Sequence, residues 1–488
     1  MPVVSAEPSR PRRTIRAVLR WLPAVVLAAL VVVATGRVLD LEGPPTSTAS
    51  IQEGNRPSTA LLSLRRSLAP LRDAAADHAL RRELDAFVAS QPPDTCLQVE
   101  AGEVRYDHRG SDPQAPASLQ KLLTAVAALT ELGEDDTYET DVLSGPVTAG
   151  VVPGNLYLRG SGDPILATPA YVARERNQPQ IFSNIDALAD AVVDAGVTTI
   201  TGSVVGDESR YDLVRYNPSL PSRLIAQGQV GPVSALSVND GFAHDALDAS
   251  GVFGPAPDPA AYAASVLDGA LRARGIAIGG PPTSGTTPAE AVVTATLTSP
   301  PMSQIVTQML RESDNNTAEL LLKEIGFRRS GVGSFEAGLS ATAAILDEAG
   351  IGIDGVVIAD GSGLTTDNTV TCALVFDLLV HEPTDEVVRS ALAVSGQTGT
   401  LAERWLGTDL VGRIRAKTGT LNQVTGLAGF ADTAGGEAAT FALLVNLTGS
   451  ERIDLATIGA QQRLAEALVA HPDLPDVDHL RPGEAAGG

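Results

Sequence analysis

Hydrophobic residues recur at two different periods along the chain. A period of three to four residues predicts helices, and it occurs at 61–90, 121–132, 185–196, 259–275, 302–310, 313–326, 335–350, 370–381 and 453–470. Alternation predicts strands, and it occurs at 95–106, 138–165, 198–207, 413–432 and 440–449. Gly133 follows the second helical range, where a glycine commonly ends a helix. Helices and strands at both ends of the chain, with a strand-rich block between them, predict an α+β fold.

The strand-rich block interrupts the rest of the chain. We predict one discontinuous α+β domain made of 61–135 and 298–472, with an inserted, mostly-β domain at 136–297. About 160 residues are enough for a domain of their own. A linker rich in Pro, Ser and Thr is expected at 38–60, and the acidic tail at 473–488 is expected to be disordered.

The N-terminal residues have the charge pattern of an export signal. Five arginines lie in the basic segment 1–20, and the segment 21–37 begins with sixteen uncharged residues. A basic segment before an apolar one directs export. The apolar run is short for a membrane span of about 20 residues, and no small-x-small cleavage site follows it, so a cleaved signal peptide and a membrane anchor both stay open. We expect an extracytoplasmic protein, either membrane-anchored or secreted.

Acidic residues dominate the charge of the chain. The formal net charge is −23, and without residues 1–37 the chain keeps 29 basic against 57 acidic residues. Such a surface repels nucleic acid and anionic membrane faces. Membrane contact is therefore expected only through the N-terminal segment, and affinity for an anionic substrate must come from a local site.

Cysteine and histidine give little sign of a metal centre. Cys96 and Cys372 are the only cysteines, which is too few for a disulfide framework. Cys96 lies in a strand-like run and Cys372 opens a helix-like run, so our default prediction is two unlinked buried thiols, although export would allow a bridge. The six histidines show no ligand spacing. We expect no metal and no cofactor.

Three short strings carry the candidate chemistry: SLQK at 118–121, SDN at 313–315 and KTGT at 417–420. Alone, the first is usually an exposed helix turn, the second a helix N-cap and the third a tight turn with a solvated lysine. In this order, the three are the signature of serine acyl-transferases that act on D-alanyl-D-alanine peptides and are trapped by penicillin. The chain is therefore expected to be an enzyme.

The residue types in these strings suit acyl transfer. Ser118 and Lys121 are three residues apart at a helix start, which puts both side chains on one face. A hydroxyl needs a base within hydrogen-bond reach to attack a peptide carbonyl. Lysine is normally cationic at pH 7, but burial beside another cation, for which Lys417 is the candidate, would favour the neutral amine.

Longer strings around the motifs resemble one family. They are PASLQKLLTAVAAL, SDNNTAELLLKEIG, DGSGL at 360–364, SGQTGTLAERW, AKTGTLNQVTGLAGFA, LRGSGDPIL and GPVSALSVNDG. They are similar to the D-alanyl-D-alanine carboxypeptidase/endopeptidase family, the class C low-molecular-mass penicillin-binding proteins, from about residue 58 to 470. The resemblance implies a penicillin-recognising serine transpeptidase-like domain, an antiparallel sheet flanked by helices, split by an insertion. The insertion is shorter here than in larger members, so a third domain is expected to be trimmed or absent.

The resemblance also implies a role for each motif residue in acylation. Ser118 would be the acylated nucleophile and Lys121 its base. Ser313 would join Lys121 and Lys417 in a proton relay, and Asn315 would hold the acyl-side amide.

The third motif would bind the substrate's end. Lys417, Thr418 and Thr420 would bind the terminal D-alanine carboxylate, and Gly419 would admit the substrate closely. The backbone N–H groups of Ser118 and Thr420 would form the oxyanion hole, in which one donor is typically worth about 3 kcal/mol of barrier.

The expected function is that of a serine D-alanyl-D-alanine carboxypeptidase that trims peptidoglycan stem peptides and is inhibited covalently by β-lactams. DD-endopeptidase activity stays open beside it. A β-lactamase with a Glu-x-x-x-Asn loop is disfavoured, because the only asparagine between Thr317 and Lys417 is Asn368, and Leu364 stands four residues before it. A cell-wall binding protein that has lost turnover is disfavoured by the intact Ser118, Lys121, Ser313 and Lys417.

Overall fold

Strand-like segments from both ends of the chain form one six-stranded antiparallel sheet. The computed structural model describes residues 64–173, 181–243, 254–449 and 451–472. The strand order is β15-β16-β17-β18-β1-β2. In that order the strands are β15 (Ala393–Val394), β16 (Ile414–Thr420), β17 (Val424–Asp432), β18 (Ala438–Asn446), β1 (Asp94–Ala101) and β2 (Val104–His108). Strands β1 and β18 pair from Asp94 opposite Asn446 onward, so the early hairpin completes a sheet that the C-terminal part of the chain begins.

The prediction of a single strand at 95–106 is wrong. The segment is a hairpin of β1 and β2, with Ala101 opposite Val104. Gly102 occupies the turn with φ +56°, a conformation that glycine adopts without steric cost. The alternation continues on both sides of the turn, so hydrophobic period alone does not reveal it.

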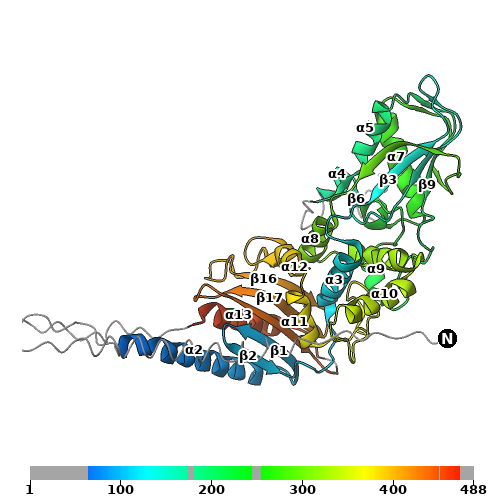
Figure 1. The fold of residues 1–488 in the computed structure, drawn as a ribbon. Coiled ribbons are helices and arrows are strands. Elements are labelled where there is room, and N and C mark those ends of the chain that lie inside the picture. The colour runs from blue at the N-terminus through cyan, green and yellow to red at the C-terminus, as the bar shows by residue number, and fades with distance from the viewer. Residues whose placement is uncertain (1–63, 174–180, 244–253, 450, 473–488) are drawn as a thin grey trace, which may run out of the picture. The chain divides into compact units, whose positions relative to one another are not determined.

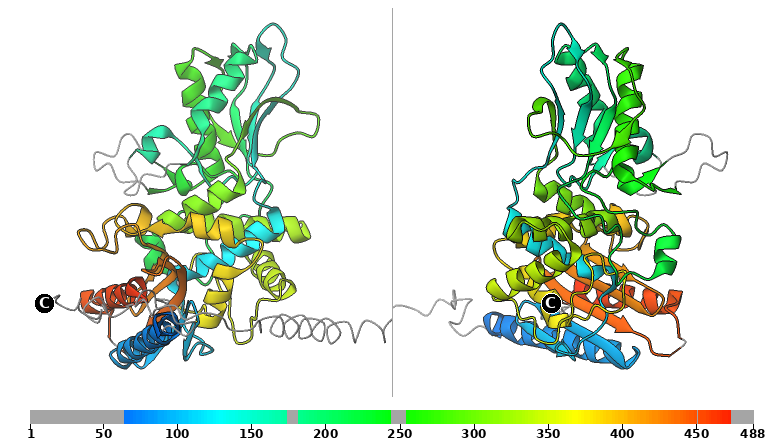
Figure 2. Two further views of the ribbon diagram at one scale, coloured as in Figure 1. Left: turned by 60° about the vertical axis from the view of Figure 1, so that its left-hand side comes forward. Right: turned by 90° about the vertical axis from the view of Figure 1, so that its right-hand side faces the viewer.

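Both faces of the sheet are covered by helices. Along β18, Phe441, Leu443 and Val445 belong to one hydrophobic cluster, and Ala442 and Leu444 belong to the other. The first cluster contains α2 (Leu64–Ala89) and α13 (Leu455–Ala470), which therefore lie on the same face. Figure 1 labels α2 and α13 beside the strands of the sheet, and Figure 2 shows the same arrangement from two other sides.

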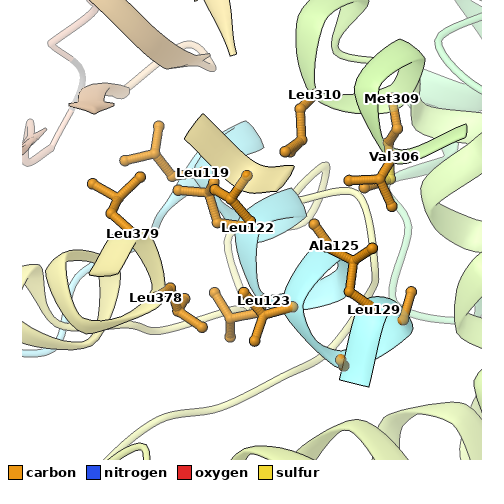
Figure 3. Packing of buried hydrophobic residues seen from close by; sticks show 14 of the residues in the cluster. Leu119, Leu122, Leu123, Ala125, Leu129, Val306, Met309, Leu310, Leu378 and Leu379 are labelled. Carbon is orange, nitrogen blue, oxygen red and sulfur yellow. The ribbon is translucent and has the colours of Figure 1, made fainter. Parts of the chain in front are cut away.

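The second face carries the helices that hold the motifs. Their bounds are α3 (Gln120–Leu132), α8 (Met302–Glu312), α9 (Asn315–Ser330), α10 (Phe335–Glu348), α11 (Cys372–Val380) and α12 (Asp385–Ala391). Helix α3 is central, since Leu122 and Leu123 pack in one cluster with Met309 of α8 and Leu378 of α11 (Figure 3). Gly133 ends α3, as predicted. The start of α3, directly after the turn that holds Ser118, is thereby fixed between the sheet and two other helices.

The part of the chain between β2 and β15 forms a second sheet of its own. Its order is β13-β9-β5-β3-β14. The strands are β3 (Glu139–Ser144), β5 (Leu156–Arg159), β9 (Val204–Asp207), β13 (Thr283–Ser284) and β14 (Val292–Thr298). Strands β3 and β14 pair antiparallel, which brings the entry and exit of this segment side by side.

Helices α5 (Ile185–Asp194) and α7 (Pro259–Ala273) pack on this second sheet in one hydrophobic cluster. The N-caps are Asn184 and Asp258, whose side chains accept from backbone N–H groups of the first turn. The remaining elements are short: β4 (Val151–Val152), β6 (Leu166–Ala167), α4 (Pro169–Val172), β7 (Ser183–Asn184), β8 (Thr199–Ile200), α6 (Ser222–Ala226), β10 (Phe242–Ala243), β11 (Gly254–Pro255) and β12 (Ala277–Ile278), with 3-10 turns η1 (Ala117–Leu119), η2 (Asn239–Gly241) and η3 (Gly399–Leu401).

One part of the inserted segment packs against the helices that cover the first sheet, and not against the second sheet. Tyr211, Val233 and Ala235 share a cluster with Leu320 and Phe335. A neighbouring cluster joins 220–230 to the 360–364 loop. The segment from about 208 to 235 therefore packs against the helices that carry the motifs. The domain boundaries at 136 and 297 stay a prediction.

The predicted leader at 1–37, linker at 38–60 and tail at 473–488 lie outside the described residues. Within the described residues, no helix is both long and apolar enough to cross a membrane.

The prediction of two unlinked thiols is wrong, because Cys96 and Cys372 form a disulfide. Cys96 in β1 and Cys372 at the start of α11 both belong to the cluster on the motif face of the sheet. The bond joins positions 276 residues apart, a separation at which no sequence pattern reveals proximity.

We expect the double variant Cys96→Ser/Cys372→Ser to lose about 2–5 kcal/mol of unfolding free energy, because a cross-link over a long loop restricts the unfolded chain. Denaturant unfolding of the purified protein measures this. Reducing the native protein should reproduce the variant's midpoint, and reductant should not move the variant further. Equal midpoints for native and double-variant protein would contradict a stabilising bond.

Candidate active site

Ser118 lies in a tight turn directly before α3. The turn η1 begins at Ala117, whose φ of +46° is uncommon for a residue with a side chain. The loop 360–364 packs directly behind it: a Cβ on Gly363, which itself has φ +81°, would lie 1.9 Å from the Ala117 carbonyl oxygen. This close backbone contact fixes the position of the Ser118 turn against the 360–364 loop.

Lys121 is the first partner of that hydroxyl. Its side chain is fully buried, and Nζ lies 3.2 Å from Ser118 Oγ. Two shorter bonds hold the amine from the other side, 2.7 Å to Asn315 Oδ1 and 2.6 Å to the Ser362 carbonyl oxygen. The i, i+3 pair predicted from the SLQK string is thus in contact.

A second lysine–serine pair comes from the other two motifs. Lys417 of β16 is also fully buried, and its Nζ donates to Ser313 Oγ at 2.8 Å and to the Thr418 carbonyl oxygen at 2.8 Å. Among the described residues, Lys417 forms no ion pair. Each lysine therefore has a serine hydroxyl within hydrogen-bond reach.

The SDN string joins two helices. Ser313 ends α8 in the left-handed conformation, with φ +62°. Asp314 is the N-cap of α9 and accepts from Thr317 N at 3.1 Å, so only Asp314 fills the capping role that the string alone suggested. Asn315 bridges two parts of the site: its Oδ1 accepts from Lys121, and its Nδ2 donates to the Gln229 carbonyl oxygen at 2.7 Å.

The KTGT string ends strand β16 against the Ser118 turn. A Cβ on Gly419 would lie 2.9 Å from the Pro116 carbonyl oxygen and 3.1 Å from Ser118 N, so only glycine fits without a shift. Thr418 Oγ1 lies 2.9 Å from Thr400 Oγ1, and Thr420 Oγ1 donates to the Gly419 carbonyl oxygen. Strand β15 pairs only with Arg415 and Ala416, so beyond Lys417 this edge of β16 has no strand partner among the described residues.

A cavity of about 640 Å³ opens in front of these groups. Motif residues on its wall are Ser118, Ser313, Asn315, Thr418 and Thr420. The rest of the wall comes from Arg223, Leu224, Gln227, Gln229, Leu364, Leu421, Asn422, Arg452 and Ile453. None of these lining residues is acidic, and two are arginines.

The two lysine amines have altered proton affinities. Burial lowers the pKa of Lys121 from 10.5 to about 8, against the opposing effect of the carboxylates of Asp360, Asp314 and Glu319. Burial, followed by the charge of Lys121, lowers the pKa of Lys417 well below its ordinary value. Two ammonium groups cannot be held at this place without cost, so one amine is readily neutral.

Comparison with known proteins agrees with this geometry. The model of the D-Ala-D-Ala carboxypeptidase 3 (S13) family matches residues 71–253 and 251–466.

The chain belongs to this family.

Relatives in several bacteria match along most of their length. A D-alanyl-D-alanine carboxypeptidase of Actinomadura sp. (strain R39) is 29% identical over 443 residues, which cover 74% of this chain and 80% of the relative. Carboxypeptidase DacB of Mycolicibacterium smegmatis is 29% identical over 401 residues, 77% of this chain and 83% of the relative. The crystal structure of penicillin binding protein 4 (dacB) from Haemophilus influenzae aligns with a TM-score of 0.65 at 22% identity, covering 78% of this chain and 97% of that one. This structural likeness confirms the predicted fold class, and the match to the family model confirms the predicted family.

Two buried acidic residues near Lys121 were not predicted from the sequence as part of the site. Glu319 and Asp360 are both fully buried. Glu319 lies in the helical string that follows SDN, and Asp360 opens the DGSGL string. A carboxylate in either context is usually solvated, so no local pattern places either one in the interior. The α6 side of the cavity was also missed, because 208–235 lies inside the predicted insertion.

We expect Gly419→Ala in this S13 protein to lower the rate of Ser118 acylation by about 100-fold, because the new Cβ would push β16 away from the Ser118 turn. Labelling kinetics with a fluorescent penicillin measure the rate. Gly459→Ala is the matched control: Gly459 is exposed on α13, nothing lies within 4 Å of its added Cβ, and its rate should equal the native one. A native rate in Gly419→Ala would show that the close approach is dispensable.

Proposed function

We propose that this chain is a serine D-alanyl-D-alanine carboxypeptidase that trims peptidoglycan stem peptides through an acyl-enzyme on Ser118 and is acylated by β-lactams. The observation that carries the proposal is the convergence of two lysine–serine pairs, Lys121 with Ser118 and Lys417 with Ser313, at one cavity. Membership of the S13 family supports the same reaction.

The geometry around Lys121 suits a base. Asn315 Oδ1 and the Ser362 carbonyl oxygen are acceptors only, and they take the two short bonds from Nζ. A neutral amine has two N–H groups for these acceptors, which leaves its lone pair for the third, longer contact with the Ser118 hydroxyl. Ser118 then loses its proton to Nζ as Oγ bonds to the carbonyl carbon of the penultimate D-alanine.

The remaining groups complete the acyl transfer. The carbonyl oxygen becomes negatively charged and accepts from the backbone N–H groups of Ser118 and Thr420. Ser313, held by Lys417, passes a proton to the nitrogen of the terminal D-alanine as the C–N bond breaks. The proton that Lys121 took from Ser118 then replaces the one that Ser313 gave up. Asn315 holds the acyl-side amide. Water then attacks the ester, restores Ser118 and releases the shortened peptide.

Substrate binding would redistribute protons between the lysines. The carboxylate of the terminal D-alanine would accept from Lys417, Thr418 and Thr420, beside Gly419. A carboxylate next to Lys417 raises the pKa of that amine, and a charged Lys417 in turn disfavours a proton on Lys121. The substrate would thus help to produce the neutral amine of Lys121, which takes the proton of Ser118 during the attack. Cross-linked peptides offer the same scissile bond, and DD-endopeptidase activity is the finer question that a cross-linked substrate would test.

We also propose that the protein acts outside the cytoplasmic membrane, secreted or anchored through 21–37, with 61–135 and 298–472 as the catalytic domain and 136–297 as an insertion. The basic and apolar N-terminal segments support export. The Cys96–Cys372 disulfide supports an oxidising compartment.

Released D-alanine tests the function directly. Incubation with a pentapeptide ending in D-Ala-D-Ala should release one D-alanine per peptide, and a fluorescent penicillin should label the protein covalently. Ser118→Ala should abolish both and keep the native melting temperature, because the change removes only a hydroxyl. A folded native protein that binds the peptide without releasing D-alanine would favour a binding role, and rapid turnover of nitrocefin would favour a β-lactamase.

The pH dependence of acylation tests the base. Because the neutral amine of Lys121 accepts the proton and its pKa is about 8, the second-order rate of penicillin acylation should rise with pH through about 8 and then level off. Lys121→Arg, which cannot lose its proton in this range, should remain unlabelled at every pH. A flat profile in the native protein would exclude Lys121 as the titrating base.

A further inference from the structure

Every polar backbone group in the middle of the 360–364 loop is held by a side chain. Glu319 Oε1 accepts from Gly361 N at 3.1 Å and from Ser362 N at 2.9 Å. Thr124 Oγ1 donates to the Gly361 carbonyl oxygen at 2.8 Å, and Lys121 Nζ donates to that of Ser362 at 2.6 Å. Glu319 therefore grips the N–H side of the same residue whose carbonyl receives Lys121.

Asp360 fixes the two ends of this loop. Its Oδ1 accepts from Gly363 N at 2.6 Å and from Asn368 Nδ2 at 2.8 Å, and its Oδ2 accepts from Thr365 N at 2.9 Å. The hydrogen bonds of the Asp360 carboxylate thus go to the loop and to Thr365 and Asn368, which follow it in the chain. Glu319 differs, because it joins the loop to α9, on which Asn315, the other acceptor of Lys121, lies one turn earlier.

Burial of the Glu319 carboxylate beside this loop costs free energy. Its side chain is fully buried, and within the described residues its second oxygen, Oε2, has no hydrogen-bond partner. A buried carboxylate with a free oxygen needs compensation. The charged groups that act on Glu319 are Asp360 on the loop and Lys121 on α3. Asp314 at the start of α9 and Lys417 on β16 are charged neighbours of Lys121. Burial and the neighbouring Asp360 raise the pKa of Glu319 to about 7, and Lys121 opposes that shift.

We propose that Glu319 is a positioning residue for acylation, which fixes the amine of Lys121 through the Ser362 peptide and stabilises its protonated form by charge. This rests on the proposed function. The residue thus has two separable roles, a hydrogen-bond clamp on the loop and a negative charge behind the base.

Glu319→Gln separates the charge from the clamp. The amide oxygen can still accept from Gly361 N and Ser362 N, but the negative charge is lost. Without it Lys121 loses its proton more easily, so the acid limb of the acylation rate should move to lower pH by about one unit, while the plateau rate stays within about tenfold of native. Rates of labelling by fluorescent penicillin between about pH 5.5 and 9.5 give both quantities.

Two further variants test the clamp. Glu319→Ala removes both bonds to the loop, and the plateau rate should fall by about 100-fold because the acceptor of Lys121 is no longer fixed. Thr124→Val keeps the charge of Glu319 and removes only the bond to Gly361, so it should lower the plateau by about tenfold without moving the limb.

Glu324→Gln is the matched control, with the same substitution on the same helix. Glu324 is equally buried, but it accepts from Arg210 and Tyr211, away from Lys121. It should lower the melting temperature and leave both the limb and the plateau native. An effect of Glu319→Gln that comes only from general destabilisation would appear in Glu324→Gln as well.

The outcomes separate this proposal from the proposed function. Native protein that neither takes up penicillin nor releases D-alanine contradicts the function itself. Native protein that acylates, with a Glu319→Gln limb that coincides with the native limb, contradicts the charge role. A native plateau in folded Glu319→Ala contradicts the clamp role of Glu319. A native plateau in Thr124→Val contradicts the premise that the position of the 360–364 loop controls the rate, and this result is available even where Glu319 variants do not fold.

Discussion

Burial of two lysine amines at one place is the constraint on which the rest of the structure depends. Lys121 and Lys417 are both fully buried, and a buried amine needs hydrogen-bond partners in fixed positions. Those partners come from four separate parts of the chain: the Ser118 turn, the α8–α9 junction, the 360–364 loop and strand β16 itself. Helix α3 packs between the sheet, α8 and α11, and this packing keeps the four parts at fixed relative positions (Figure 3). The geometry of the polar site therefore depends on the packing of the large hydrophobic cluster.

Much of this could be predicted because it is local. The start of α3 follows from the SLQK spacing and its end from Gly133, and the N-cap of α9 follows from Asp314. The ordered strings also name the residues that converge, since their types suit one reaction. Proximity itself is not local: nothing in the string AELLLKEIG indicates that its first glutamate faces a lysine 198 positions earlier in the chain, because burial of a carboxylate is decided by what packs on it.

The two wrong predictions, and one placement that the sequence did not indicate, have the same origin. Alternation runs through Gly102, so the β1–β2 turn depends on one backbone conformation that hydrophobic period does not encode. Cys96 and Cys372 meet only because β1 is the neighbour of β18 and α11 covers that face. The segment 208–235 has the punctuation of the insertion around it, yet it packs against α9 and α10, and it brings Arg223 and Gln229 to the cavity wall. Tertiary pairing decides all three.

The distribution of acid in the molecule follows from the same two lysines. Beyond residue 37 the chain is strongly acidic, yet the residues that line the cavity include two arginines, Arg223 and Arg452, and no acid. Carboxylates on the open side of Lys417 would compete with an anionic substrate for its amine and repel it. Behind Lys121, on the closed side, the carboxylates of Glu319 and Asp360 have the opposite effect, because they stabilise a proton on the base without access to the substrate. A carboxylate on the cavity side of the two lysines would therefore repel the substrate, whereas a carboxylate on the buried side stabilises the protonated base.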